Sequence, residues 1–119
     1  YGTTVQMARK AAEIMAERGV QTRIIDLRTL RPMDEETILK AAKECGKVLV
    51  VTEDRFPGGV GATIASVITR GRGIFDLEAP VKLLTAIDAR VAYGTDGDEA
   101  CLPTVDKIAA EIDDLHNNY

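Results

Sequence analysis

The stretch GKVLVVTEDRFPGGVGATIASVI, residues 46–68, decides the fold of this 119-residue chain. It begins with an apolar run over residues 47–52, whose Val-Leu-Val-Val core is β-branched and almost uninterrupted. Such a run is typical of a strand that is covered on both faces, as in the middle of a parallel sheet. A charged break and a glycine-rich turn follow, and then an apolar pattern resumes at helical spacing. The stretch therefore predicts a strand, a turn at its carboxyl end and a helix that covers the sheet.

The glycine-rich turn contains Gly58, Gly59 and Gly61, at the strand end where open α/β sheets usually bind their ligands. Free amides at the start of a helix favour an anion, and the Gly59-x-Gly61 pair matches part of a dinucleotide-binding loop. However, Ile64 stands where that fingerprint requires its third glycine. We therefore prefer the interpretation that small residues let the helix pack closely on the strand, with anion or nucleotide binding as the alternative.

The composition indicates one globular domain. Apolar residues make up 45% of the chain, both signs of charge are mixed, and the net charge is -4. A chain of this length can bury about two thirds of the surface that its unfolded form exposes, so one domain can fold by itself. The acidic balance argues against a sequence-independent nucleic-acid binder and favours a basic partner. No apolar run reaches the roughly 18 residues of a membrane span.

Candidate nucleophiles and metal ligands are few. Cys45 and Cys101 form no CxxC motif, and they have no usual zinc-site spacing with His116, the single histidine. Cys45 is predicted in the last turn of a helix, where no helix N-terminus activates its thiol. We expect both cysteines to be reduced and buried, and a disulfide between them is the alternative. Reduced thiols point to a reducing compartment such as the cytoplasm. His116 is predicted in the final helical turn, where a cation complements the helix dipole.

The remaining segments alternate between helix and strand. Asp34 is a favourable N-cap, and glycines follow several helical patterns. Before the central strand and helix, we expect a helix capped by Thr3 or Thr4 and stopped by Gly19, a strand over residues 20–27 and a helix from Asp34 to Gly46. After them we expect a strand over residues 81–87, a surface loop over residues 88–101 and a helix that starts within residues 102–104. This order predicts a three-layer α/β/α sandwich with a mostly parallel sheet. The first helix needs a strand to pack on, so we expect a strand to end at or just before Tyr1.

Charges of both signs close two of the predicted strands. Asp26 and Arg28 follow the strand over residues 20–27, and residues 53–55 (Glu-Asp-Arg) follow the central strand. We expect these charges to form ion pairs between neighbouring strand ends, and a docking edge for another domain is the alternative. The residues by themselves indicate a non-catalytic module.

Four segments carry a family resemblance: IDLRTLRPMDEETI (residues 25–38), the central stretch (46–68), LEAPV (77–81) and LPTVDKIAAEI (102–112). In this order they resemble the C-terminal domain shared by thiamine-diphosphate enzymes of the transketolase superfamily. They are most similar to the β subunit of the E1 component of 2-oxo acid dehydrogenase complexes, of the pyruvate and branched-chain types. The resemblance implies that residues 1–119 are one domain of a longer chain. It also implies that the sheet of this domain has about five strands, of which the first is truncated here.

The resemblance implies an activity for the parent enzyme and no catalytic role for this domain. The parent would use thiamine diphosphate and magnesium to decarboxylate a 2-oxo acid and would pass the acyl group to the lipoyl domain of E2. The family's catalytic, cofactor-binding and metal-binding residues have no matching positions here, so none is assigned. Residues 88–93 lack the prolines that E1 β subunits carry at that place. A C-terminal domain of transketolase or of 1-deoxyxylulose-5-phosphate synthase is therefore the alternative.

The resemblance also implies two groups of contact residues. One group is similar to the segment that packs against the pyrimidine-binding domain of the same chain and against the opposite E1 α subunit; it consists of Glu53, Gly58, Gly59 and Gly61. The other consists of Glu78, similar to an acidic contact for the E2 subunit-binding domain, and Tyr119 at the C-terminal end. An apolar patch left by an absent domain would favour homodimers. The implied location is the cytoplasm, or the mitochondrial matrix in a eukaryote.

Overall fold

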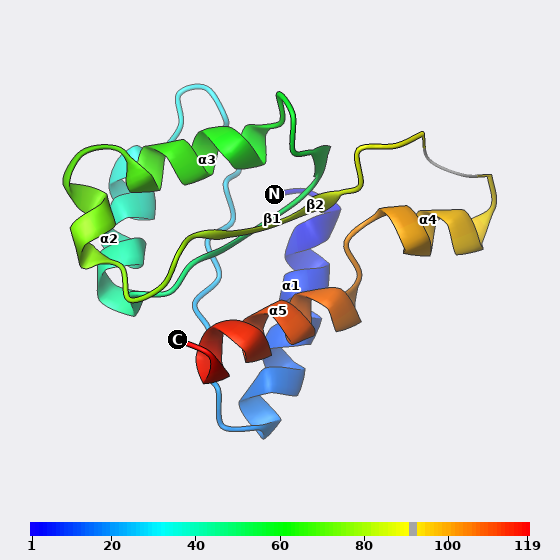
Figure 1. Ribbon diagram of the computed structural model, residues 1–119, viewed down its shortest axis with the longest axis horizontal. Helices are drawn as coiled ribbons and strands as arrows, with labels where there is room; N and C mark the ends of the chain where they lie inside the picture. The colour runs from blue at the N-terminus through cyan, green and yellow to red at the C-terminus, as the bar shows by residue number, and fades with distance from the viewer. Residues whose placement is uncertain (91–92) are drawn as a thin grey trace.

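The computed structural model describes residues 1–90 and 93–119, and it places helices on both sides of a short sheet (Figure 1). The elements in chain order are α1 (Thr3–Glu17), α2 (Glu35–Cys45), β1 (Leu49–Arg55), α3 (Val60–Thr69), the 3₁₀ helix η1 (Gly71–Asp76), β2 (Lys82–Ala86), α4 (Thr95–Cys101) and α5 (Val105–Asn117). The strands β1 and β2 are parallel, and their register pairs Leu49 with Lys82. Within the described residues, no helix has both the length and the apolar character needed to cross a membrane.

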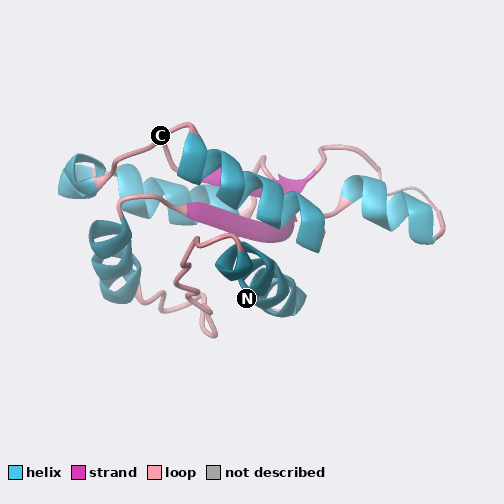
Figure 2. Ribbon diagram, turned by 90° about the horizontal axis from the view of Figure 1, so that it is seen from below, coloured by secondary structure: helices cyan, strands magenta, loops and turns pink. Residues whose placement is uncertain are grey.

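Two apolar cores lie on opposite faces of β1, because successive side chains of a strand point to opposite sides. Val50 packs on one face with side chains of α2 and α3, namely Ile38, Ala42, Ile64 and Ile68. Leu49 and Val51 pack on the other face with side chains of α1 and α5, namely Ala11, Met15, Ile108 and Ala109. Figure 2 shows the strands with helices on both sides. The predicted three-layer α/β/α sandwich is confirmed.

Several helix ends follow the sequence predictions. The Asp34 carboxylate accepts a hydrogen bond from the backbone amide of Thr37 at 3.0 Å, as an N-cap should. Gly46 ends α2 with a left-handed φ of 70°. The predicted cap of α1 by Thr3 or Thr4 is wrong, because Gly2 is the N-cap residue and no side-chain hydrogen bond caps the helix.

The predicted strand over residues 20–27 is wrong. This stretch, segment 20–27 below, has no regular secondary structure between α1 and the isolated bridge of Leu30 with Met33. Its alternating pattern suits a strand, but no neighbouring strand pairs with it. The described residues therefore contain two strands, where about five were expected.

The region after β2 is more ordered than the sequence predicts. The expected strand over residues 81–87 is confirmed as β2, but the expected loop over residues 88–101 contains α4. The carbonyl of Cys101, the last residue of α4, accepts a hydrogen bond from the amide of Ile87 at 3.0 Å. This bond ties α4 to the end of β2. The helix was missed because its acidic residues and Gly97 give no apolar period. Two of the residues in the proline-free stretch 88–93, residues 91 and 92, lie outside the described residues.

Candidate functional site

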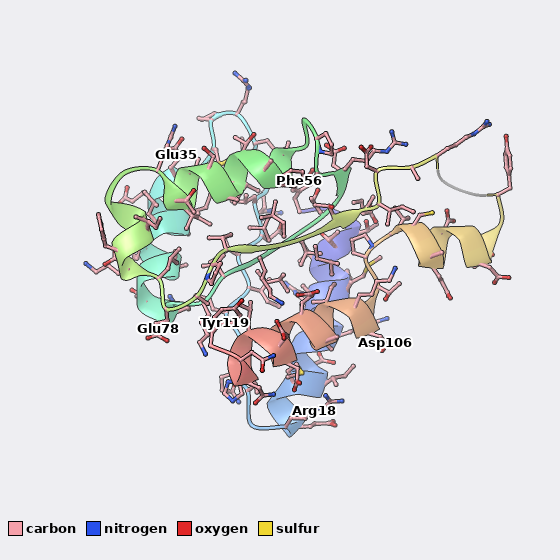
Figure 3. The ribbon with its side chains drawn as sticks, in the orientation of Figure 1. Arg18, Glu35, Phe56, Glu78, Asp106 and Tyr119 are labelled. Atoms are coloured by element: carbon pink, nitrogen blue, oxygen red, sulfur yellow. The ribbon has the colours of Figure 1, made fainter. Side chains whose placement is uncertain are left out.

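The two predicted groups of contact residues lie at opposite ends of β1. Glu53 is in the carboxyl half of the strand, and the three glycines of the first group lie between this strand and the start of α3 or at that start. Glu78 lies at the other end, where its amide donates a hydrogen bond to the carbonyl of Gly46 at 2.7 Å. In Figure 3 Glu78 and Tyr119 lie toward one end of the sheet, and Phe56 lies toward the other. The sheet therefore separates the predicted interface group from the predicted docking group.

The glycine turn is packed too tightly for side chains. A Cβ atom on Gly59 would lie 2.2 Å from the carbonyl oxygen of Arg55, and one on Gly61 would lie 2.8 Å from the Thr52 side chain. These distances support the interpretation that the glycines let α3 approach β1 closely. The carboxylate of Asp54 lies 3.2 Å from the Cβ position of Gly59, so the turn already holds a negative charge. That charge disfavours the alternative of an anion site.

Glu53 and its neighbours make local contacts and not the predicted ion pairs. The hydroxyl of Thr3 donates a hydrogen bond to Glu53 at 2.5 Å, which joins the start of α1 to β1. Arg55 donates to the carbonyl of Ala89 at 2.9 Å. Among the described residues, no salt bridge joins Asp26 or Arg28 to the end of β1. The predicted pairs are absent there because segment 20–27 does not pair with β1.

The docking group is held beside the C-terminal end of α5. The side chain of Glu78 lies over Gly46, where an added Cβ atom would be 2.9 Å from its Cγ and Cδ. The next residue, Lys47, donates from Nζ to the carbonyl of His116 at 3.4 Å. Glu78 is exposed, and Tyr119 is 56% exposed. An exposed carboxylate and an exposed aromatic ring therefore lie at the same end of the domain.

The best-defined charge cluster has a structural role. Lys82 of β2 contacts Asp114 and also Glu111, the latter at 2.6 Å, and both acids belong to α5. The hydrogen bond to Asp114, followed by that to Glu111, raises the pKa of Lys82 above its ordinary value. The hydrogen bond from Lys82 likewise lowers the pKa of Asp114. All three side chains are partly exposed, so solvent screening keeps the stabilisation small. The cluster fastens α5 to the sheet.

The thiols and the histidine do not form a reactive group. Cys45 and Cys101 are both free thiols, and Cys101 is buried as predicted. The predicted burial of Cys45 is wrong, since this residue is exposed at the end of α2. His116 lies exposed in the last turn of α5, where the sequence placed it.

The described residues offer no donor set that fits a magnesium diphosphate. No three side chains of the metal-binding types come together among them. Every buried side-chain nitrogen or oxygen atom there also has a hydrogen-bond partner, so no orphaned polar group points to a ligand. We therefore derive no chemical step through thiamine diphosphate in this domain.

The sequence interpretation missed a groove between β1 and segment 20–27. Two adjoining cavities, of about 440 and about 170 Å³, are lined by residues of both. Tyr1, Cys45 and Lys47 line both cavities, and Glu78 lines the larger one. The signal that points to this groove is the alternating pattern of segment 20–27, which predicts a strand but pairs with no strand among the described residues.

The parallel strands, the two layers of helices and the tight glycine turn define an α/β/α sandwich domain. A family model described as the C-terminal domain of transketolase matches residues 1–108. The chain belongs to the transketolase C-terminal domain family. A solved structure described as a split-gene transketolase, an inactive β4 tetramer, shares this fold with a TM-score of 0.79 and 24% identity, over 96% of this chain and 35% of that chain.

The curated relatives include β subunits of two dehydrogenases. The chain is 36% identical over 116 residues to the 2-oxoisovalerate dehydrogenase subunit beta of Bacillus subtilis (strain 168), which covers 97% of the chain and 35% of that protein. It is 33% identical to the pyruvate dehydrogenase E1 component subunit beta of Rickettsia bellii, over 87% of the chain and 32% of that protein. The corresponding subunit of Staphylococcus aureus is 35% identical, over 91% of the chain and 33% of that protein. The chain thus spans about a third of the length of these relatives.

Proposed function

We propose that these 119 residues are the C-terminal assembly and docking domain of an E1 β subunit. The complete enzyme would decarboxylate a 2-oxo acid with thiamine diphosphate and magnesium, and it would transfer the acyl group to lipoyl-E2. The observation that carries the proposal is the 36% identity over 97% of the chain to a 2-oxoisovalerate dehydrogenase β subunit. In this proposal the domain holds partners together, and the chemistry takes place in the rest of the enzyme.

The glycine turn is the proposed contact with the pyrimidine-binding domain and with the E1 α subunit. Gly59 lies so close to the carbonyl of Arg55 that a Cβ atom has no room there, so the backbone itself forms this part of the surface. Phe56 is 59% exposed beside it and offers an apolar surface that another domain can cover. A closely packed turn with an exposed aromatic ring suits a permanent interface.

Glu78 and the C-terminal end are the proposed contact with the E2 subunit-binding domain. The chain as a whole is acidic, with a net charge of -4, which favours a basic partner. Opposite charges across an interface mainly accelerate the encounter and fix the orientation of the partners. The exposed side chains of Glu78 and Tyr119 lie at the same end of the domain, which supports a docking role of this type (Figure 3).

The test is reconstitution of the complete enzyme. The longer subunit that contains these residues is expressed together with its E1 α partner, and acylation of a lipoyl domain is measured with pyruvate and with branched-chain 2-oxo acids. We expect acylation that depends on thiamine diphosphate and magnesium, while calorimetry detects no specific binding of thiamine diphosphate to the 119-residue chain. Ketose-phosphate transfer without 2-oxo acid activity would assign the domain to a transketolase-type enzyme and overturn the proposal.

A further inference from the structure

The 3₁₀ helix η1 exposes two consecutive apolar side chains. Phe75 is 85% exposed and Ile74 is 50% exposed, although such side chains are usually buried. Leu39 of α2 is 37% exposed and lies beside η1, because the Cβ position of Gly73 is 3.3 Å from its Cδ2 atom. Phe75, Ile74 and Leu39, called the η1 patch below, form an apolar surface that the described residues leave open to solvent.

The backbone around the η1 patch is fixed to the domain. Leu77, two residues after Phe75, packs against the core that contains Ile38 of α2. Its amide donates a hydrogen bond to the carbonyl of Ile74 at 3.4 Å. The two exposed side chains of η1 are therefore presented from an anchored turn. Adjacent apolar side chains that stay exposed are typical of an interaction site, whereas single ones are common on any surface.

On the side of Glu78, acidic side chains border the η1 patch. Asp76 and Glu78 are both exposed, and among the described residues no salt bridge occupies either carboxylate. Glu78 lies three residues after Phe75, so their Cα atoms are at most about 11 Å apart. A stable complex buries about 800 Å² on each partner, which is wide enough to cover both residues. One partner can therefore contact the ring and the carboxylates together.

We propose that the η1 patch is the apolar anchor of the docking surface for the E2 subunit-binding domain, and that Phe75 is the side chain that retains the bound domain. The matching surface of the E2 domain would be an apolar side chain or pocket bordered by basic residues, because Asp76 and Glu78 lie beside the patch. The inference rests on the proposed function, which assigns Glu78 to this docking.

The ring and the carboxylates have different roles in this docking. An aromatic side chain that is fully covered in a complex contributes most to affinity, and its loss mainly raises the dissociation rate. A charge at the rim of an interface mainly raises the association rate, and salt screens its effect. Phe75 therefore sets how long the E2 domain stays bound, and Glu78 sets how fast it arrives.

A second copy of the chain is a poorer occupant of the η1 patch. In a two-fold dimer that is centred on Phe75, residues near the axis face their own copies. Asp76 would then face the same acid of the other copy, and like charges across an interface oppose binding.

The pyrimidine-binding domain is also a poorer occupant, because its proposed contacts lie at the other end of the sheet. The helix α3 runs from the glycine turn to the residue before η1, and its 10 residues separate the two places by about 15 Å. In Figure 1, η1 is drawn in yellow-green beside α2, away from the turn that precedes α3.

The dissociation rate of the E2 subunit-binding domain tests the anchor. The longer subunit is assembled with its E1 α partner, and binding of the purified E2 domain is measured by surface plasmon resonance. In Phe75→Ala we expect dissociation at least about tenfold faster, with an association rate within about twofold of wild type. Tyr93→Ala is the matched control, since Tyr93 is an aromatic residue with 88% exposure that follows β2, and it should behave as wild type. Phe75→Leu keeps an apolar side chain and should restore most of the residence time.

Three further measurements separate the anchor from a general loss of structure or charge. At about 0.5 M salt the Debye length falls to about 4 Å, so the effect of Phe75→Ala should persist while that of Glu78→Lys shrinks. The melting temperature of Phe75→Ala should stay within about 3 °C of wild type, because truncation of an exposed ring costs little stability. Hydroxyl-radical footprinting should oxidise Phe75 in the enzyme alone and protect it once the E2 domain is bound.

Three results would contradict the anchor. One is an equal dissociation rate for Phe75→Ala and Tyr93→Ala. Another is protection of Phe75 before the E2 domain is added, which would mean that an interface within the enzyme covers the ring. The third is self-association of the assembled enzyme that Phe75→Ala abolishes in sedimentation, which would make a second copy the occupant.

Acylation of a free lipoyl domain, measured on the same preparations, separates the anchor from the proposed function. Phe75→Ala should acylate a free lipoyl domain at the wild-type rate, because docking is not needed there. A wild type without 2-oxo acid activity, or one that does not bind the E2 domain, sinks the proposed function and the anchor with it. An active wild type that binds the E2 domain equally well without the Phe75 ring sinks only the anchor.

Discussion

Single residues at the start of β1 hold the proposed docking group in place. Gly46 takes the left-handed conformation that ends α2, and its carbonyl accepts the hydrogen bond from the amide of Glu78. At the other end of α2, hydrogen bonds from the backbone amide and the hydroxyl of Thr37 hold the pKa of Asp34 below its ordinary value. Both ends of the helix are therefore fixed by residues whose types the sequence already indicates.

Reversal of the charge at Glu78 is expected to weaken docking without unfolding the domain. In Glu78→Lys, association with the E2 subunit-binding domain should slow by about tenfold at low salt, because a charge at an interface rim acts mainly on the association rate. Glu13→Lys, an exposed substitution of the same charge on α1, is the matched control and should bind normally. Surface plasmon resonance at several salt concentrations measures both. Equal association rates for the two variants would remove Glu78 from the docking surface.

The contact between Gly46 and Glu78 predicts a second docking variant. Gly46→Ala places a methyl group 2.9 Å from the Glu78 side chain, which must then move, whereas Gly19→Ala has a similar positive φ and open space around it. Both should lower the free energy of unfolding by about 1–2 kcal/mol, the penalty of a left-handed non-glycine residue. Only Gly46→Ala should also weaken binding of the E2 domain. Denaturant unfolding and calorimetry separate the two effects, and unchanged binding in Gly46→Ala would contradict the contact.

The cap at Asp34 predicts a pH dependence of stability. Its pKa is lower in the folded chain than in the unfolded one, so the stabilisation is complete above the unfolded pKa, about 3.9, and is lost as pH falls through the folded value. Asp34→Asn keeps a capping oxygen but does not titrate. Below about pH 4 the melting temperature of the wild type should therefore fall relative to that of Asp34→Asn. A difference that stays constant from pH 7 to pH 3 would show that the carboxylate charge adds nothing to the cap.

At the scale of elements, the sequence predicts those whose partners lie within the chain. The strand at residues 47–52 and α3 were predicted because both strand faces and one helix face bury apolar side chains of these residues. The strand predicted for segment 20–27 is wrong because its residue pattern suits a strand, but a strand also needs a neighbouring strand to pair with. The predicted burial of Cys45 is wrong, because this residue is exposed at the end of α2. The helix α4 escaped prediction because its seven residues carry two acids in the first turn and no apolar period.

The turn between β1 and α3 predicts unequal effects for adjacent glycines. Gly59→Ala forces a methyl group against the carbonyl of Arg55, so backbone must shift, and we expect a loss of about 2–3 kcal/mol. Gly58→Ala has a φ of 76° but no atom within 4 Å, so only conformational strain of about 1–2 kcal/mol applies. Chemical denaturation measures both. Equal losses would contradict the predicted clash at Gly59. A melting temperature that phosphate raises in wild type and not in Gly59→Ala would support the anion-site alternative.

At the scale of the whole molecule, the domain is slightly open. Its radius of gyration is 14.1 Å, against about 13.5 Å for a compact domain of this length. Two strands connect the layer of α1 and α5 to the layer of α2 and α3, and the groove runs beside them. A sheet this narrow still couples the layers, because Val50 faces one core while Leu49 and Val51 face the other. The domain should therefore unfold as one unit.

Truncations in the two cores test this coupling. Ile68 and Ile108 are each 1% exposed and lie on opposite sides of the sheet. Ile68→Ala and Ile108→Ala should each remove about 2–5 kcal/mol, and Ile68→Val, which is expected to remain folded, about 1 kcal/mol. Circular dichroism and the reactivity of Cys101 should report one coincident transition in every variant, because both cores share β1. Two separate transitions, with each truncation shifting only its own, would mean that two strands are too few to join the layers.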